Sequence, residues 1–179
     1  MVSAPATPEF SRAIPLSEIG VGAKPRHIEA DEKERAALVR RFGLLSLDLL
    51  AADVAVQPDG AGYLAVGRLR GKALQACVAS GEPVPASIEE SFRIRFVAEA
   101  SYDADAEVEL DADDCDTLFH DGRAIDLGEA VAESFALALD PFPRSANADA
   151  ALKAAGVKDE SEAGPFGALA ALKDKLEKK

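Results

Sequence analysis

Two short stretches of the chain carry a cation at every second position. The residues between these cations are apolar or glycine, and this period of two is typical of a β-strand whose two faces differ. Arginine binds phosphate oxygens in a planar, two-pronged geometry, and an ordered strand holds such side chains at a fixed spacing. The pattern therefore predicts that Arg68, Arg70, Lys72, Arg93 and Arg95 share one exposed strand face, which makes them candidates for contact with the phosphates of RNA.

The aromatic residues near these cations are expected in the core. Phe92 and Phe96 alternate with the arginines of their strand, so they do not offer platforms for base stacking. RNA binding should therefore depend on phosphates and on RNA shape, and it should weaken strongly as salt rises. A simpler alternative is also open, because exposed strand faces are often charged and Glu89 and Glu90 are near enough in sequence to pair with the cations.

A second charged segment contains only acids. Eight carboxylates lie between residues 103 and 116, and no basic residue interrupts them. Like charges at this density resist burial, so an exposed loop or a weak edge strand at about 107–110 is expected. The segment could capture a basic protein, mask the cationic face, or simply keep the chain soluble. Its candidate partner-binding residues are Asp103, Asp105, Glu107, Glu109, Asp111, Asp113, Asp114 and Asp116.

The chain has only two histidines and two cysteines, and its many acids form no recognisable acid–base pair. The histidines, His27 and His120, lie in no catalytic motif, and His120 is expected at the surface because a turn follows it. Cys77 falls on the apolar side of its strand and is expected to be a buried thiol, whereas Cys115 lies among aspartates. We expect no enzyme, no metal and no cofactor. A pocket that joins His120 to several carboxylates would favour catalysis instead.

The chain is acidic overall, but its charge is unevenly distributed. Its 179 residues carry a formal charge of −12, of which residues 1–100 contribute −1 and residues 101–179 contribute −11. The acidic average disfavours general nucleic-acid binding, and no DNA partner is expected. No apolar stretch is long enough to span a bilayer, and the first residues do not resemble a secretory signal. We therefore expect a cytoplasmic protein with no membrane partner.

The elements that would position these residues form an α+β domain. Alternating patterns predict strands from Leu49 to about Pro58, from Tyr63 to Val78 and from Ile88 to Val97, joined by short turns into an antiparallel meander. Capping pairs and helical periodicity predict helices at 31–42 and 126–139. We therefore expect a curved, barrel-like antiparallel β-sheet covered by these two helices.

Shorter elements are predicted on both sides of this arrangement. Strands are expected at 10–14 and 26–29, and a short helix at 148–155. Pro165 opens a last amphipathic helix with lysines near its end. The predicted domain therefore covers residues 9–157, and residues 158–179 form a C-terminal helical arm.

Two blocks of the sequence carry a family resemblance. One is LQACVASGEPVPASIEESFRIRF at residues 74–96, and the other is IDLGEAVAESFALALDPFPRS at residues 125–145. They resemble, respectively, the strand, cysteine, turn and strand module and the proline-terminated helix of the YceD-like family, the bacterial large ribosomal RNA subunit accumulation proteins. The resemblance extends more weakly over most of residues 9–157.

The resemblance implies a non-catalytic ribosome-biogenesis factor that supports the accumulation of large-subunit (23S) ribosomal RNA. Together with the cationic face, it favours contact with large-subunit ribosomal RNA or a precursor particle. The alternative is a protein-interaction module that holds a basic ribosomal protein through residues 103–116.

The chain departs from the family pattern at its cysteines. Many members carry a second cysteine three residues after the first and another beyond the final prolines, which suggests metal binding. Here Cys77 is retained, but Ser80 and Ser145 stand at the corresponding positions. A hydroxyl is a poor substitute for a thiolate on zinc, so we expect no metal. We call the region around Cys77, Ser80 and Ser145 the Cys77 corner, and we expect packing to hold it together.

Overall fold

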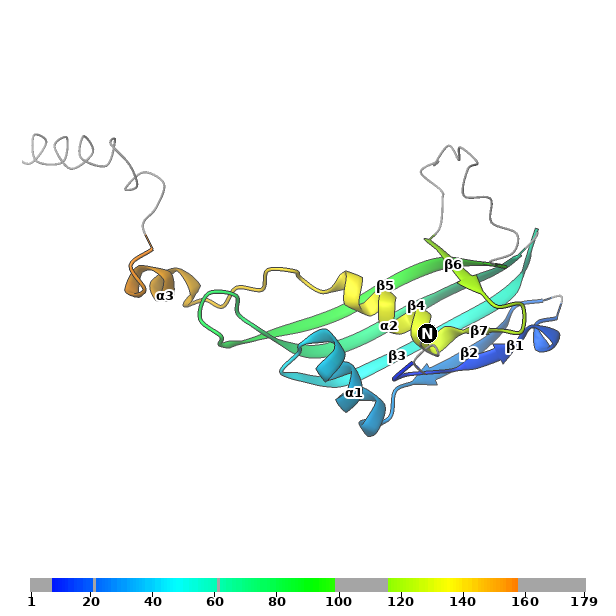
Figure 1. Ribbon diagram of the computed structural model, residues 1–179, viewed down its shortest axis with the longest axis horizontal. Coiled ribbons are helices and arrows are strands. Elements are labelled where there is room, and N and C mark those ends of the chain that lie inside the picture. Colours follow the sequence, from blue (N-terminus) through cyan, green and yellow to red (C-terminus); the bar gives the residue numbers. More distant parts are fainter. Residues whose placement is uncertain (1–7, 21, 61, 99–115, 158–179) are drawn as a thin grey trace, which may run out of the picture. The chain divides into compact units, whose positions relative to one another are not determined.

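A computed structural model describes residues 8–20, 22–60, 62–98 and 116–157 (Figure 1). The chain divides into two compact units. The first comprises Met1–Gln75 and Pro85–Asp140, and the second comprises Ala76–Val84 and Pro141–Lys179. All five predicted RNA-binding cations therefore lie in the first unit.

The first unit is built on a five-stranded sheet. Its strands, in their order across the sheet, are β2 (Lys24–Glu29), β3 (Ser46–Asp59), β4 (Gly62–Ala76), β5 (Pro83–Ala98) and β6 (Asp116–His120). The pairs β2–β3 and β3–β4 are antiparallel, and the second of these pairs belongs to the predicted meander. However, β6 runs parallel to β5, so the prediction of a purely antiparallel sheet is wrong. Because β2 and β6 are the two edges of the described sheet, these strands form no closed barrel.

Strand β5 begins five residues earlier than the sequence predicted, in spite of two prolines. Its partner β6 pairs only with Ile94–Ala98, so the first half of β5 has no described neighbour on that side. A proline at a sheet edge removes no ladder hydrogen bond. Pro83 and Pro85 therefore fit at the start of this strand.

A second, two-stranded sheet joins the start of the first unit to its later part. Strand β1 (Ala13–Pro15) pairs antiparallel with β7 (Ala124–Asp126), and Ile14 lies opposite Ile125. Both isoleucines are buried. The strand predicted at 10–14 thus begins later than expected. A 3₁₀ turn, η1 (Leu16–Glu18), follows it.

Helix α1 (Glu32–Phe42) has the ends that the sequence predicted. The carboxylate of Asp31 accepts from the backbone N–H of Glu34 at 2.9 Å, and the carboxylate of Glu34 accepts from the backbone N–H of Asp31 at 2.7 Å. Gly43 ends the helix in the left-handed conformation, at a φ of 64°. These capping contacts satisfy backbone groups that the helix itself leaves unpaired.

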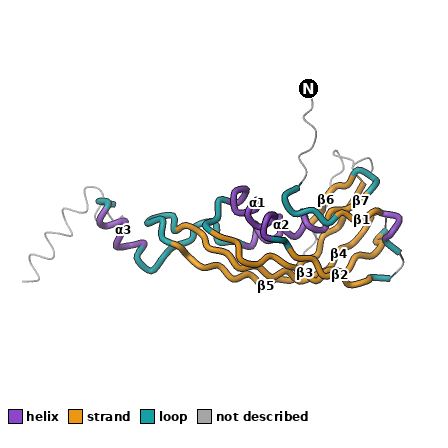
Figure 2. Tube along the Cα trace, turned by 90° about the horizontal axis from the view of Figure 1, so that it is seen from below, coloured by secondary structure: helices purple, strands orange, loops and turns teal. Residues whose placement is uncertain are grey.

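Helix α2 (Leu127–Ala138) confirms the strongly periodic helix predicted at 126–139. The carboxylate of Asp126 caps it by accepting from the backbone N–H groups of Gly128 and Glu129. Figure 2 shows α1 and α2 on the same side of the large sheet. The buried residues of α2 are Leu127, Gly128, Ala130, Val131, Ala132 and Phe135.

Strand β4 turns its apolar and small residues toward the core, and Gly71 lies against Phe135 of α2. Leu69, Gly71 and Ala73 are buried, and a methyl group at Gly71 would lie 2.3 Å from Cε2 of Phe135. Phe135 is itself fully buried in the core. Glycine at this position therefore lets α2 approach the sheet closely.

The second unit contains α3 (Ala148–Ala154), which confirms the short helix predicted at 148–155. Gly156 follows it at a φ of 80°. The predicted C-terminal arm at 158–179 lies outside the described residues. Within the part of the chain that the structure describes, no helix is long and apolar enough to cross a membrane.

The close approach at Gly71 gives a test of the packing. Gly71→Ala should lower the free energy of unfolding by about 1–3 kcal/mol, because the added methyl group must displace a fully buried aromatic ring. Gly20→Ala is the control, since no heavy atom lies within 4 Å of its Cβ position. Urea denaturation measures both variants. Equal stability of Gly71→Ala and the parent would contradict the described packing.

Candidate functional site

The five predicted RNA-binding cations are exposed on β4 and β5. They alternate with Leu69, Ala73, Ile94 and Phe96, which all belong to one hydrophobic core. Since successive side chains of a strand point to opposite faces, the cations share the face that is turned away from this core. We call this the outer face.

Three of the five cations pair with acids on neighbouring parts of the sheet. Each of these pairs joins an arginine to one carboxylate at 3.2 or 3.3 Å, and all the side chains are substantially exposed. The pairs are Arg68 with Glu89, Arg70 with Asp53 and Arg95 with Asp59. Among the described residues, the outer face is therefore a mixed charge surface on which Lys72 and Arg93 have no acidic partner.

The acidic partners do not prevent a polyanion from binding to the arginines of the outer face. An exposed ion pair contributes only about 0–1 kcal/mol, because water and salt screen it. A polyanion that presents several phosphates at once can replace such carboxylates, although each replacement reduces its net gain. Sequence reasoning considered Glu89 as a partner. It missed Asp53 and Asp59, because only the strand register brings them to these arginines.

His27 is a further titratable group on this face that the sequence analysis did not assign to it. It lies directly opposite Asp53, which in turn lies opposite Arg68. His27 Nδ1 is 2.7 Å from Asp53 Oδ1, and this hydrogen bond is the main reason that the pKa of His27 is raised. Asp53 thus holds both His27 and Arg70. Protonation of His27 would add positive charge to the edge of the outer face.

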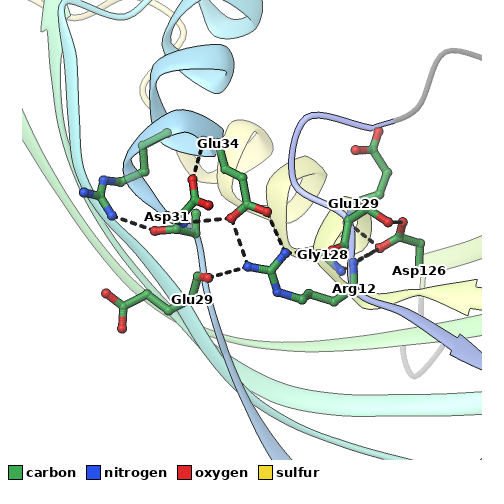
Figure 3. Close-up of polar contacts among 10 residues, drawn as sticks. Arg12, Glu29, Asp31, Glu34, Asp126, Gly128 and Glu129 are labelled. Atoms are coloured by element: carbon green, nitrogen blue, oxygen red, sulfur yellow. Dashed lines mark hydrogen bonds and ion pairs between the residues drawn. The ribbon is translucent and has the colours of Figure 1, made fainter.

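On the other side of the sheet, Arg12 connects the starts of the two helices (Figure 3). Its guanidinium donates to both oxygens of Glu34, at 2.6 and 2.9 Å, and to the backbone oxygen of Glu29 at 2.8 Å. Its backbone N–H donates to Asp126 Oδ1 at 2.7 Å. The contact with Arg12 lowers the pKa of Glu34. These groups hold α1 and α2 over the core.

A pocket of about 370 Å³ lies within the first unit. His120 is one of its lining residues and is buried, so the prediction of a surface histidine is wrong. Its Nδ1 accepts from the backbone N–H of Gly122 at 3.0 Å, and its ring packs against the ring of Tyr63. The hydrogen bond to the turn after β6 therefore holds the imidazole in a buried position. The other polar lining residues are Asp121, Asp126, Glu129 and Glu133.

Among the described residues that line this pocket, three of the four carboxylates already have structural contacts. Asp126 caps α2, Glu129 accepts from Arg41 at 2.7 and 2.9 Å, and Asp121 accepts from the backbone N–H of Arg123. No serine, threonine, cysteine or lysine is among the described residues that line it. The pocket brings together His120 and several carboxylates, but it offers no side-chain nucleophile of these types.

Cys77, Ser80 and Ser145 lie together in the second unit. The Cys77 sulfur accepts from the backbone N–H of Ser145 at 3.2 Å, and the hydroxyl oxygens of Ser80 and Ser145 are 3.2 Å apart. Cys77 is buried, as predicted, but its surroundings are polar. The Ser145 N–H, and then the Ser80 hydroxyl, lower the pKa of Cys77 to about 6.

Further hydrogen bonds within residues 77–82, and between them and residues 143–147, stabilise the Cys77 corner. The backbone N–H of Cys77 donates to the Glu82 oxygen, and that of Val78 donates to the Pro143 oxygen. Glu82 also accepts from the side chain of Asn147 at 3.2 Å. No cluster of three or more histidine, cysteine or acidic side chains suited to a metal ion occurs in the described ranges. Hydrogen bonds, in addition to packing, hold this corner.

The acidic segment and Cys115 lie outside the described residues. The exception is Asp116, which is exposed and begins β6. The three roles considered for residues 103–116 and the edge strand expected at 107–110 therefore stay predictions.

The family model described as large ribosomal RNA subunit accumulation protein YceD matches residues 65–173, which are more than half of the chain. The chain belongs to the YceD family. No curated protein and no solved structure matches it. The matched range includes most of β4, all of β5, the Cys77 corner and α2. YceD membership links this chain to the accumulation of large-subunit ribosomal RNA.

The Cys77 corner predicts an acidic thiol. In a Cys115→Ser background, the thiolate absorbance near 240 nm should rise with a midpoint at about pH 6. Ser80→Ala should move this midpoint upward, since it removes a hydroxyl that stabilises the thiolate. The pKa of Cys77 in the folded protein lies below its value in the unfolded chain. The Cys77 thiolate therefore contributes stability that is present above the unfolded-state pKa and is lost as the pH falls through about 6. A midpoint above 8 would contradict the described contacts.

Proposed function

We propose that this YceD protein is a non-catalytic ribosome-biogenesis factor that contacts large-subunit ribosomal RNA, or a precursor particle, through the outer face. The observation that carries the proposal is the arrangement of five exposed cations on two neighbouring, ordered strands. Family membership independently supports the link to large-subunit ribosomal RNA.

The proposed contact is to phosphates. Lys72 and Arg93, which have no acidic partner in the described part of the chain, would make the first contacts with the backbone. Arg68, Arg70 and Arg95 would exchange their exposed carboxylate partners for phosphates. Binding of this kind selects structured RNA by the spacing of its phosphates and is strongly dependent on salt.

The non-catalytic part of the proposal rests on the His120 pocket. Among the described residues that line it, the carboxylates of Asp121, Asp126 and Glu129 have structural partners, and no serine, threonine, cysteine or lysine supplies a nucleophile beside His120 and Glu133. A role on ribosomal RNA also requires access to ribosome precursors. The proposal therefore includes a cytoplasmic location.

Charge reversal on the outer face tests the proposal. The triple variant Arg68→Glu, Arg70→Glu and Arg95→Glu should reduce co-sedimentation with large-subunit precursors by about tenfold or more at moderate salt, because phosphate contacts are lost and repulsion is added. The control is Lys24→Glu, Arg123→Glu and Lys153→Glu, which makes the same change in net charge at exposed positions off this face. Unchanged co-sedimentation of a folded outer-face variant would remove the proposal.

Removal of the pairing acids should have the opposite effect. Asp53→Asn, Asp59→Asn and Glu89→Gln together free three arginines, so affinity for large-subunit ribosomal RNA should rise by about threefold to tenfold at low salt. The control variant is Glu18→Gln, Glu32→Gln and Asp149→Asn, which removes the same charge elsewhere. Filter binding over a salt series measures both. An equal gain in the two variants would mean that only net charge matters.

A further inference from the structure

Asp53 on β3 is shared between two basic side chains of the outer face. Its Oδ1 lies 2.7 Å from Nδ1 of His27 on β2, and its Oδ2 lies 3.3 Å from Nη2 of Arg70 on β4. Since β3 lies between β2 and β4 in the sheet, the two partners come from opposite sides. A ligand that takes Arg70 therefore leaves this carboxylate with His27.

The strand register fixes this arrangement. His27 lies directly opposite Asp53, and Asp53 lies opposite Arg68. Arg68 pairs instead with Glu89 of β5 at 3.2 Å, and Arg70 reaches Asp53 from a position two residues along β4. Backbone hydrogen bonds hold β2, β3 and β4 at a constant spacing. The three side chains thus stand on ordered backbone.

His27 is accessible to solvent and can change its charge near neutral pH. About half of its side chain is exposed. Because the carboxylate of Asp53 only accepts, Nδ1 carries the hydrogen of their bond, and the proton that charges the ring is gained at Nε2. The charged groups that face the ring are Asp53 from β3 and, 3.6 Å from Nε2, Glu29 from β2, with Arg70 of β4 behind Asp53. Asp53, and then Glu29, raise the pKa of His27.

The charge of His27 affects how readily Arg70 can exchange its partner. A phosphate that binds Arg70 must replace Asp53. If His27 is neutral, the released carboxylate stays negative beside the phosphate, and the two anions repel each other. If His27 is protonated, its charge balances that of Asp53, so this repulsion is smaller. Polyanion binding at Arg70 therefore favours the protonated imidazole, and by linkage protonation favours binding to the same extent.

We infer that His27 is a positioning residue of the outer face: in its protonated form it retains Asp53 while Arg70 turns to an RNA phosphate, so that RNA binding takes up a proton from the solvent. The inference rests on the proposed RNA contact and adds a regulation to it, because RNA is held more tightly as the medium becomes more acidic. It also extends the functional part of the sheet to its edge strand β2.

The test is a pH profile of RNA binding by the full chain. Filter binding of transcribed 23S ribosomal RNA, at constant ionic strength, covers about pH 6 to about pH 8.5. The affinity of the parent should fall about threefold to tenfold as the pH rises above about 6.5, because the pKa of His27 lies above this ordinary value and rises further in the complex. His27→Gln cannot gain the charge. It should match the parent at the alkaline end and lose most of the pH dependence.

Asp53→Asn tests whether His27 acts through this carboxylate. The variant should bind RNA more tightly than the parent at the alkaline end, and nuclear magnetic resonance should show a lower pKa of His27. His27→Gln should cost about threefold to tenfold in affinity near pH 6 in the parent but less than about twofold in the Asp53→Asn background. The control is Glu29→Gln, at an acid whose side chain pairs with His27 and with no described arginine. Its alkaline gain should be smaller than that of Asp53→Asn.

Three results would overturn the inference: equal pH profiles of the parent and His27→Gln, an equal loss from His27→Gln with and without Asp53, or an unchanged pKa of His27 in Asp53→Asn. The proposed function is judged separately, by the reversal of Arg68, Arg70 and Arg95 measured near pH 6. If that variant loses RNA while the two profiles coincide, the inference alone fails. If that variant binds RNA like the parent, the outer-face contact fails and the inference fails with it.

Discussion

The alternation of strand β4 is the constraint on which the outer face depends. Gly71 must lie under the ring of Phe135, and Leu69 and Ala73 occupy the same side of the strand. A register shift of one residue would turn Arg70 and its neighbouring cations into the core. Burial of unpaired cations is far more costly than the loss of any single contact on the surface. Core packing therefore keeps the cations in solvent.

The outer face combines a fixed backbone with weakly held charges. The acids opposite the arginines come from β3 and β5, and their exposed ion pairs contribute little to stability. They nevertheless lower the net positive charge of the face, which makes non-specific attraction to polyanions weaker. A chain of net charge −12 can thus present cations locally without becoming a general nucleic-acid binder.

The sequence predicted features that depend on local chemistry. The caps at Asp31 and Asp126, the period of α2 and the alternation of β4 all follow from neighbouring residues, and the structure confirms them. The parallel pairing of β6, the inward position of His120 and the partners of Asp53 depend on register between segments far apart in the chain. The grouping of Cys77 with the two serines was foreseen only through family resemblance.

The most direct test of the outer-face contact is ultraviolet cross-linking of the protein to large-subunit precursor RNA, followed by mass spectrometry of the linked peptides. Cross-links should concentrate in the peptides that contain residues 68–72 and 93–95, and high salt during binding should remove them. Cross-links confined to other parts of the chain, with none in β4 or β5, would contradict it.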